Sequence, residues 1–117
     1  MKKILVVDDD PNISELIEIR LVSNGYEVIK AANGVEAFVK ASDENPNLII
    51  LDVSMPTMDG LEFVKATRWM EIKNIPILIL TARRNVKEMF QRLGITNFME
   101  KPFDSKLLLE KIAQCAI

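Results

Sequence analysis

The chain has no histidine and only one cysteine among its 117 residues. Without histidine it cannot form His-ligated zinc sites, Ser-His or Cys-His nucleophile systems, or a phosphohistidine of its own. The single cysteine, Cys115, cannot form an intramolecular disulfide, so a secreted disulfide scaffold is also excluded. We expect Cys115 to pack as a small apolar residue.

The sequence also has no large excess of charge of either sign and no long hydrophobic run. Lys and Arg number 15 against 17 Asp and Glu, which argues against direct binding of nucleic acid or of a membrane surface. No stretch approaches the roughly 20 apolar residues of a membrane span, and the first apolar run is too short for a signal peptide. We therefore expect a cytoplasmic protein. With 49% hydrophobic residues the chain can bury one core, so we expect a single domain over residues 1–117.

Short apolar runs alternate along the chain with stretches of helical period. This alternation predicts an α/β fold with a doubly wound, five-stranded parallel sheet and five helices on its two faces. The second and last runs are the most polar and are expected at the edges, which gives the strand order 2-1-3-4-5. The expected strands are 3–7, 26–31, 48–51, 76–80 and 97–100.

Capping residues predict where the helices begin. Asp10 before Pro11 suits the start of the first helix, which Asn24-Gly25 should end, and Asp104 or Ser105 should start the last. We expect apolar stripes to face the sheet, and residues 42–47 to be a connection. Capping boxes are expected at Asn33 with Glu36, Asp59 with Glu62 and Asn85 with Glu88, and the first two stripes at Ile13, Leu16, Ile17 and Leu21 and at Val35, Phe38 and Val39.

Polar residues stand at the carboxyl end of four of the expected strands. Parallel strands end at one edge of a sheet, so these side chains should converge in a crevice of the kind that binds ligands in open α/β sheets. They are Asp8, Asp9, Asp52, Thr81 and Lys101.

Three carboxylates in one crevice need a compensating positive charge. Two like charges about 4 Å apart repel by about 4 kcal/mol at an effective dielectric constant near 20. Lys101 can neutralise one acid, and the others favour a hard divalent cation that keeps several waters, such as Mg²⁺. Helix capping is the alternative interpretation of the run Asp8 to Asp10; it suits Asp10 best, so we leave Asp10 out of the metal site.

At these positions the sequence resembles the receiver domains of two-component response regulators, in the CheY-like superfamily. The resemblance covers the whole chain and implies a flavodoxin-like fold. Each motif is weak alone, but four occur in order on the expected elements. They are residues 4–10 (ILVVDDD), residues 51–60 (LDVSMPTMDG), Thr81-Ala82 and Lys101-Pro102-Phe103.

The resemblance implies that Asp52 accepts a phosphoryl group from a phosphohistidine on a sensor histidine kinase or phosphotransfer protein. Asp9 and Asp52 would then bind Mg²⁺ together with the backbone carbonyl of Ser54, and Asp8 would act mainly through water. Lys101 would pair with Asp52 and then with the phosphoryl oxygens. The domain would catalyse only its own phosphorylation and dephosphorylation.

The resemblance also implies a switch. Thr81 would move towards the phosphoryl group, and Phe98 stands where the family has its switch aromatic, although it could equally be an edge-strand core residue. Their rearrangement would reshape the face of the fourth helix, last strand and last helix, where an output protein or domain would bind. Side chains at Ser54 and Arg83 would tune the lifetime of the phosphorylated state.

Several alternatives stay open from the sequence alone. A Mg²⁺-dependent phosphohydrolase of the haloacid dehalogenase type uses similar residues, but Asn12 departs from its motif. An FMN-binding flavodoxin is disfavoured by the acidic loop after the first strand. The segment between Thr81 and Lys101 is shorter than is usual in the family, which predicts a fourth helix of only about two turns. A stand-alone domain, a part of a larger regulator and a homodimer are all compatible with the sequence.

Overall fold

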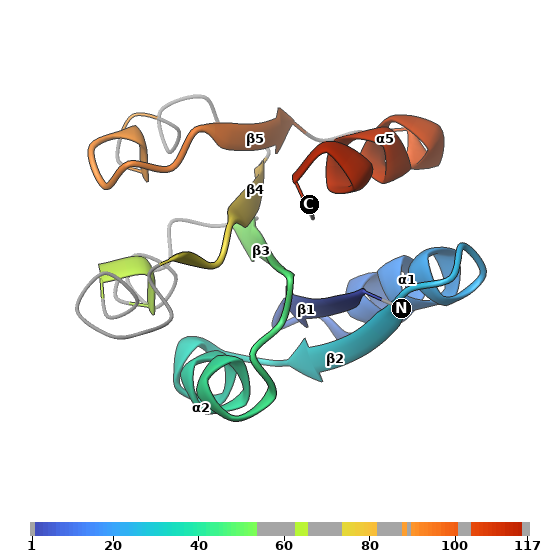
Figure 1. Ribbon diagram of the computed structural model, residues 1–117, viewed down its shortest axis with the longest axis horizontal. Helices are drawn as coiled ribbons and strands as arrows, with labels where there is room; N and C mark the ends of the chain where they lie inside the picture. The colour runs from blue at the N-terminus through green and yellow to red at the C-terminus, as the bar shows by residue number, and fades with distance from the viewer. Residues whose placement is uncertain are drawn as a thin grey trace.

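The protein folds around one five-stranded parallel sheet, as the computed structural model shows (Figure 1). The structure describes residues 2–53, 63–65, 74–81, 88, 90–100 and 104–115. The strand order is β2-β1-β3-β4-β5, with parallel pairing throughout, as the sequence predicts. The strands are β1 (Lys3–Val7), β2 (Glu27–Ala31), β3 (Leu48–Val53), β4 (Ile77–Thr81) and β5 (Asn97–Glu100), and the fully bounded helices are α1 (Pro11–Val22), α2 (Gly34–Glu44) and α5 (Ser105–Cys115).

Helices cover both faces of the sheet. Figure 1 shows α1 and α5 on one face and α2 on the other, with residues 63–65 beside it. The central strands therefore bury side chains on both sides, which explains why they are apolar almost throughout. The layer under α1 and α5 consists of Ile4, Val6, Ile17, Leu21, Leu48, Ile50, Leu78, Leu80, Leu108 and Ile112. The opposite layer includes Leu5, Val7, Ala37, Ala41, Ile49, Leu51, Phe63, Ile77, Ile79 and Phe90.

Side-chain caps begin the described helices where the sequence predicts. The Asn12 backbone N–H donates to Asp10 Oδ1 at 2.9 Å, and Pro11 follows as the first helical residue of α1. Asn33 and Asp104 cap α2 and α5 in the same way, each accepting a backbone N–H at 2.8 Å. The capping boxes expected at Asp59 and Asn85 involve residues outside the described part of the chain.

Two of the predicted apolar stripes are wrong in part. Leu16 is 57% exposed, and Val35 and Val39 are 74% and 51% exposed. On α2 the buried positions instead include Ala37 and Ala41, both fully buried. The wide side chains of the sheet already fill the space beneath this helix, so small residues let its backbone lie close while the valines face outward.

The connection predicted at residues 42–47 is also too long, because α2 continues through Glu44. The helix ends at Asn45, whose backbone is left-handed with φ of 48°. Its N–H donates to the carbonyl of Ala41. Asparagine tolerates this conformation better than most residues with a Cβ. Asn45 therefore marks the end of the helix more specifically than the polar character of residues 42–47 does.

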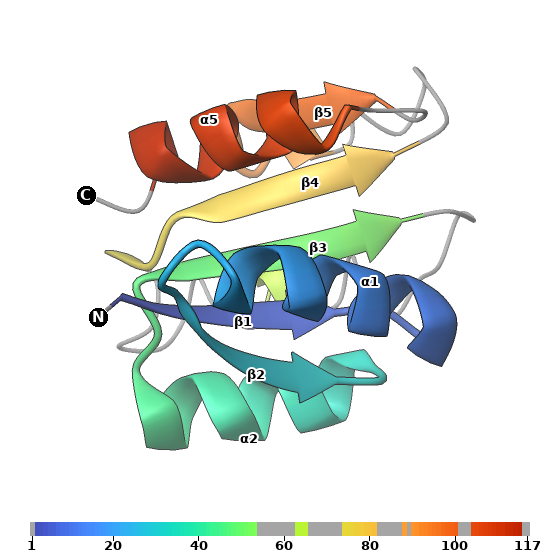
Figure 2. The same ribbon diagram turned by 90° about the vertical axis from the view of Figure 1, so that its right-hand side faces the viewer.

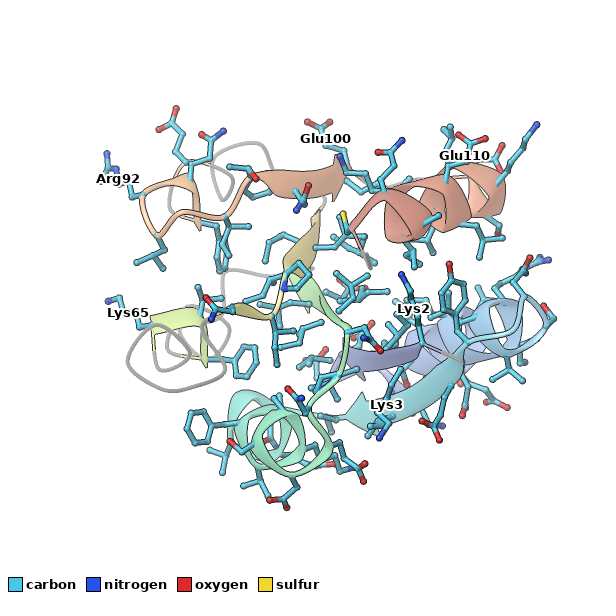
Figure 3. The ribbon with its side chains drawn as sticks, viewed as in Figure 1. Lys2, Lys3, Lys65, Arg92, Glu100 and Glu110 are labelled. Atoms are coloured by element: carbon cyan, nitrogen blue, oxygen red, sulfur yellow. The ribbon has the colours of Figure 1, made fainter. Side chains whose placement is uncertain are left out.

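Lys3 joins β1 to its neighbours at the end of the sheet where β1 begins. Lys3 is labelled in Figure 3. Its Nζ lies 3.0 Å from Glu44 Oε2 and 3.7 Å from Glu27 Oε2. The hydrogen bond with Glu44 is the main cause that raises the pKa of Lys3 above its ordinary value. This charged contact lies at the amino end of the strands, whereas Asp8 and Asp52 stand at their carboxyl end.

Gly25 ends the turn after α1 and has a φ of +89°. We expect Gly25→Ala to lower the free energy of unfolding by about 1–2 kcal/mol, because a residue with a Cβ is strained in this region. An added Cβ would meet nothing within 4 Å, so the cost comes from the backbone alone. Urea denaturation measures it, with Ser42→Ala on the exposed face of α2 as the control. Equal stability of Gly25→Ala and wild type would contradict this explanation.

Candidate functional site

The carboxyl ends of the strands lie along one edge of the sheet, as the arrowheads in Figure 2 show. Val7 of β1 pairs with Leu51 of β3, so Asp8 and Asp52 follow paired residues on neighbouring strands. Both acids therefore stand at the switch point between β1 and β3, as predicted. β3 is longer than expected and includes Asp52, because its backbone keeps pairing with β4 as far as Val53.

Asp8 is fixed from two sides. Its backbone N–H donates to the carbonyl oxygen of Ala31 at 3.0 Å. Its Oδ1 accepts the backbone N–H of Asp10 at 2.9 Å. The side chain is 4% exposed, so a carboxylate stands almost fully buried at the end of β1. Because a buried charge is costly without compensation, this position favours a cation close by.

The other two acids are more accessible. Asp9 is exposed, and Asp52 is half-buried at the end of the central strand β3. Asp52 can therefore be reached from solvent while its backbone is held within the sheet. Asp10 caps α1, which agrees with leaving it out of the metal site.

A metal ion would have to complete this site with ligands beyond the three acids. Within the part of the chain that the structure describes, which contains Asp8, Asp9 and Asp52, no group of three or more His, Cys, Asp or Glu side chains is placed to hold a metal ion. Hard carboxylate oxygens nevertheless fit Mg²⁺, which takes one or two carboxylates and keeps several waters. The donor set thus suits Mg²⁺ chemically without forming a preassembled cage.

The structure describes only some of the remaining predicted site residues. Lys101, Ser54 and Arg83 lie outside the described residues. The backbone of Thr81 ends β4, where it pairs with Val53 and with Glu100 of β5, which places it two strands from Asp8. The Thr81 backbone thus lies at the strand end that the sequence predicts, and the roles of Thr81, Lys101, Ser54 and Arg83 remain predictions.

Phe98 lies in the edge strand β5, opposite Ile79 of β4. Its ring is half-buried and packs against the core layer on the α2 side of the sheet. The interpretation as an edge-strand core residue therefore describes its place in this structure, and a switch role would require the ring to leave that packing.

One contact at the site could not be read from the sequence. The carbonyl of Ala31, at the end of β2, holds the backbone of Asp8. A backbone acceptor carries no residue-type signal, and only the register between β1 and β2 identifies it.

The doubly wound sheet with acids at its switch point defines a class of α/β domain that binds ligands at the carboxyl ends of its strands, and the comparison with known families identifies which one. Residues 4–113 match the response regulator receiver domain family, and the chain belongs to that family.

Similar proteins include transcriptional regulators. The alkaline phosphatase synthesis transcriptional regulatory protein PhoP of Bacillus subtilis is 44% identical over 107 residues, which cover 90% of this chain and 44% of that protein. The DNA-binding dual master transcriptional regulator RpaA of Synechocystis is 36% identical over 115 residues, 96% of this chain and 48% of that protein. The chain thus spans a little under half the length of these relatives.

Solved structures resemble the whole chain. Chemotaxis protein CheY4 of Vibrio cholerae superposes with a TM-score of 0.89 at 40% identity, covering 98% of each chain. Response regulator TrrA of Thermotoga maritima, solved in complex with Mg²⁺ and BeF, has a TM-score of 0.85 at 38% identity and covers 98% of this chain and 99% of that one. Among the described residues, no helix is both long and apolar enough to cross a bilayer.

Proposed function

We propose that Asp52 is the phosphoacceptor of this receiver domain. The observation that carries the proposal is the arrangement at the switch point, where half-buried Asp52 stands at a strand end next to buried Asp8. Strand pairing fixes the Asp52 backbone, and the residue is only half-buried, which leaves access for a phosphoryl donor. An acid with no capping duty at the end of an apolar strand is costly unless it serves such a purpose.

The reaction is a transfer between two protein side chains. A carboxylate oxygen of Asp52 attacks the phosphorus of a phosphohistidine on a sensor histidine kinase or phosphotransfer protein. A P–O bond forms, the P–N bond breaks, and the departing imidazole nitrogen keeps the electron pair and takes a proton from solvent. The product is an aspartyl phosphate, and the domain turns over only its own modified residue.

Asp9, Asp52 and the Ser54 carbonyl would bind Mg²⁺, with Asp8 acting mainly through water. A bound Mg²⁺ supplies charge neutralisation between the carboxylate nucleophile and the phosphoryl oxygens. On the chain itself, the Lys101 ammonium and the Thr81 hydroxyl would donate hydrogen bonds to those oxygens. The small number of protein oxygens favours weak Mg²⁺ binding before phosphorylation.

The output would come from the face formed by residues 85–93, β5 and α5. Movement of Thr81 towards the phosphoryl group and of Phe98 out of its core packing would reshape this face for an output protein or domain. Ser54 and Arg83 would set the lifetime of the phosphorylated state through access of water. Cytoplasmic location and the absence of direct nucleic-acid binding by this domain remain predictions from the sequence and the family, and the sequence leaves monomer and homodimer equally open.

Incubation with acetyl phosphate and Mg²⁺ tests the proposal directly. Intact-mass analysis is expected to find one added phosphoryl group per chain, and none when EDTA removes the metal. A haloacid dehalogenase-type phosphohydrolase would instead release phosphate in large excess over protein. Release of that kind, or uptake that is unaffected by EDTA, would contradict the proposed reaction.

A further inference from the structure

The position of Asp8 depends on the end of an edge strand. Its backbone N–H donates to the carbonyl of Ala31, the last residue of β2, at 3.0 Å. Among the strands that the structure describes, β2 pairs with β1 alone, so sheet pairing holds its end from one side. Contacts that hold β2 on its other side therefore also affect the position of the Asp8 backbone.

Two charged side chains of α2 hold the backbone on either side of Ala31. Lys40 Nζ donates to the carbonyl of Lys30 at 2.5 Å, immediately before Ala31. Glu36 hydrogen-bonds with the backbone of Ala32, immediately after it. Lys40 and Glu36 also bind each other, with Nζ 3.0 Å from Oε1. The Lys40–Glu36 clip, as we name this pair, thus joins α2 to both peptide neighbours of the residue that holds Asp8.

The clip is an electrostatic unit in its own right. The hydrogen bond with Lys40 is the main cause that lowers the pKa of Glu36, and the bond with the Ala32 backbone acts in the same direction. Glu36 is therefore a carboxylate throughout the neutral range. Asn33 orients it further, because its Oδ1 accepts the Glu36 backbone N–H at 2.8 Å.

An exposed pair four residues apart on a helix stabilises a protein only slightly. Lys40 and Glu36 are 38% and 41% exposed, so a contribution to global stability does not account for the two backbone contacts. The two backbone contacts instead hold the peptide groups on either side of Ala31. They thereby fix the Ala31 carbonyl, which in turn holds the backbone of Asp8.

We propose that Lys40, together with Glu36, is a positioning residue for Asp8 and thereby sets the Mg²⁺ affinity of the acidic site. The inference rests on the proposed function. Residues that orient a metal site through its supporting contacts commonly change its affinity when they are replaced. Lys40 acts through the backbone of Ala31 and does not contact the metal or the phosphoryl group.

The test compares Lys40→Met with Lys30→Met. Both remove one positive charge near the end of β2 and keep an unbranched apolar stem. Lys30 pairs with Glu18 of α1 at 2.8 Å, so its replacement breaks an exposed ion pair on the other face of the sheet. Loss of a positive charge alone would strengthen cation binding to an acidic site. A weaker site in Lys40→Met therefore has the opposite sign to the simple electrostatic effect.

Mg²⁺ titration followed by the NMR shifts of the Asp8 and Asp9 amides supplies the readout without a phosphodonor. We expect the dissociation constant to rise about three- to tenfold in Lys40→Met, less than for direct supporting contacts to metal ligands. Lys40→Arg, which keeps the donors, should restore it, and Lys30→Met should leave it unchanged or slightly lower. Equal affinities of Lys40→Met and Lys30→Met would overturn the proposal.

Hydrogen exchange of the Asp8 amide separates this inference from the proposed function. Exchange in the metal-free protein should be several-fold faster in Lys40→Met, with an unchanged midpoint of global unfolding. Unchanged exchange would contradict the Lys40–Glu36 clip even if Asp52 is phosphorylated. Conversely, wild-type protein that binds no Mg²⁺ would contradict the proposed function, while faster exchange in Lys40→Met would still support the clip as a support for Asp8.

Discussion

Asp52→Asn is expected to abolish phosphoryl uptake from acetyl phosphate. The amide has nearly the shape of the carboxylate but no anionic oxygen to attack phosphorus, so the acyl phosphate cannot form. We expect uptake to fall by at least about a thousandfold, the scale seen when a catalytic nucleophile is removed, which is complete loss within an intact-mass measurement. The fold should survive, because Asp52 is half-buried and an isosteric change adds no volume to the core.

Asp10→Asn is the matched control for this result. It makes the same chemical change two residues from Asp8, but Asp10 caps α1 and asparagine caps about as well. This variant should take up one phosphoryl group as wild type does. Equal loss in both variants would mean that crevice charge, rather than the Asp52 carboxylate, decides uptake.

Leu78→Ala is expected to lower the free energy of unfolding by about 3–5 kcal/mol. Leu78 lies in β4, near the centre of the sheet, and is fully buried in the layer that α1 and α5 cover. The surrounding strands are fixed by pairing on both sides, so they cannot close over the lost methyl groups and a cavity remains. Urea denaturation at fixed pH measures the change.

Leu16→Ala tests whether burial is the cause. The same atoms are removed, but Leu16 is 57% exposed on α1. We expect a change within about 0.5 kcal/mol, as for most surface substitutions. A cost close to that of Leu78→Ala would show that the exposed face of α1 is packed in solution.

The strand order was predictable because two simple features agree. Central strands buried on both faces are apolar throughout, and edge strands such as β2 carry Glu27 and Lys30 on exposed positions. Helix starts at Asp10, Asn33 and Asp104 were predictable because a capping side chain satisfies backbone groups that belong to the helix end alone.

Side-chain burial on the helices was less predictable. Periodicity places Val35 and Val39 on the same side of α2, and hydrophobicity suggested that this side faces the sheet. The structure buries Ala37 and Ala41 instead, because close packing selects for fit as well as for apolar character. The exposed valines contribute apolar surface of the kind common on folded proteins.

The candidate site shows the same division. The sequence correctly predicted that Asp8 and Asp52 stand at neighbouring strand ends, because each acid directly follows an apolar run that forms a strand. The sequence could not predict how far each acid is exposed to solvent. In the structure Asp8 is buried and Asp9 is exposed. Nor could it identify the Ala31 carbonyl as the support of Asp8, because that contact depends on where β2 ends.

The most direct test of the central claim is to locate the phosphoryl group on the chain. Treatment of the phosphorylated protein with borohydride reduces an aspartyl phosphate to homoserine and releases phosphate, and peptide mass spectrometry then identifies the altered position. We expect homoserine at position 52 alone, dependent on prior incubation with acetyl phosphate and Mg²⁺. Homoserine at position 8 or 9, or phosphorylation at a residue that borohydride leaves unchanged, would contradict it.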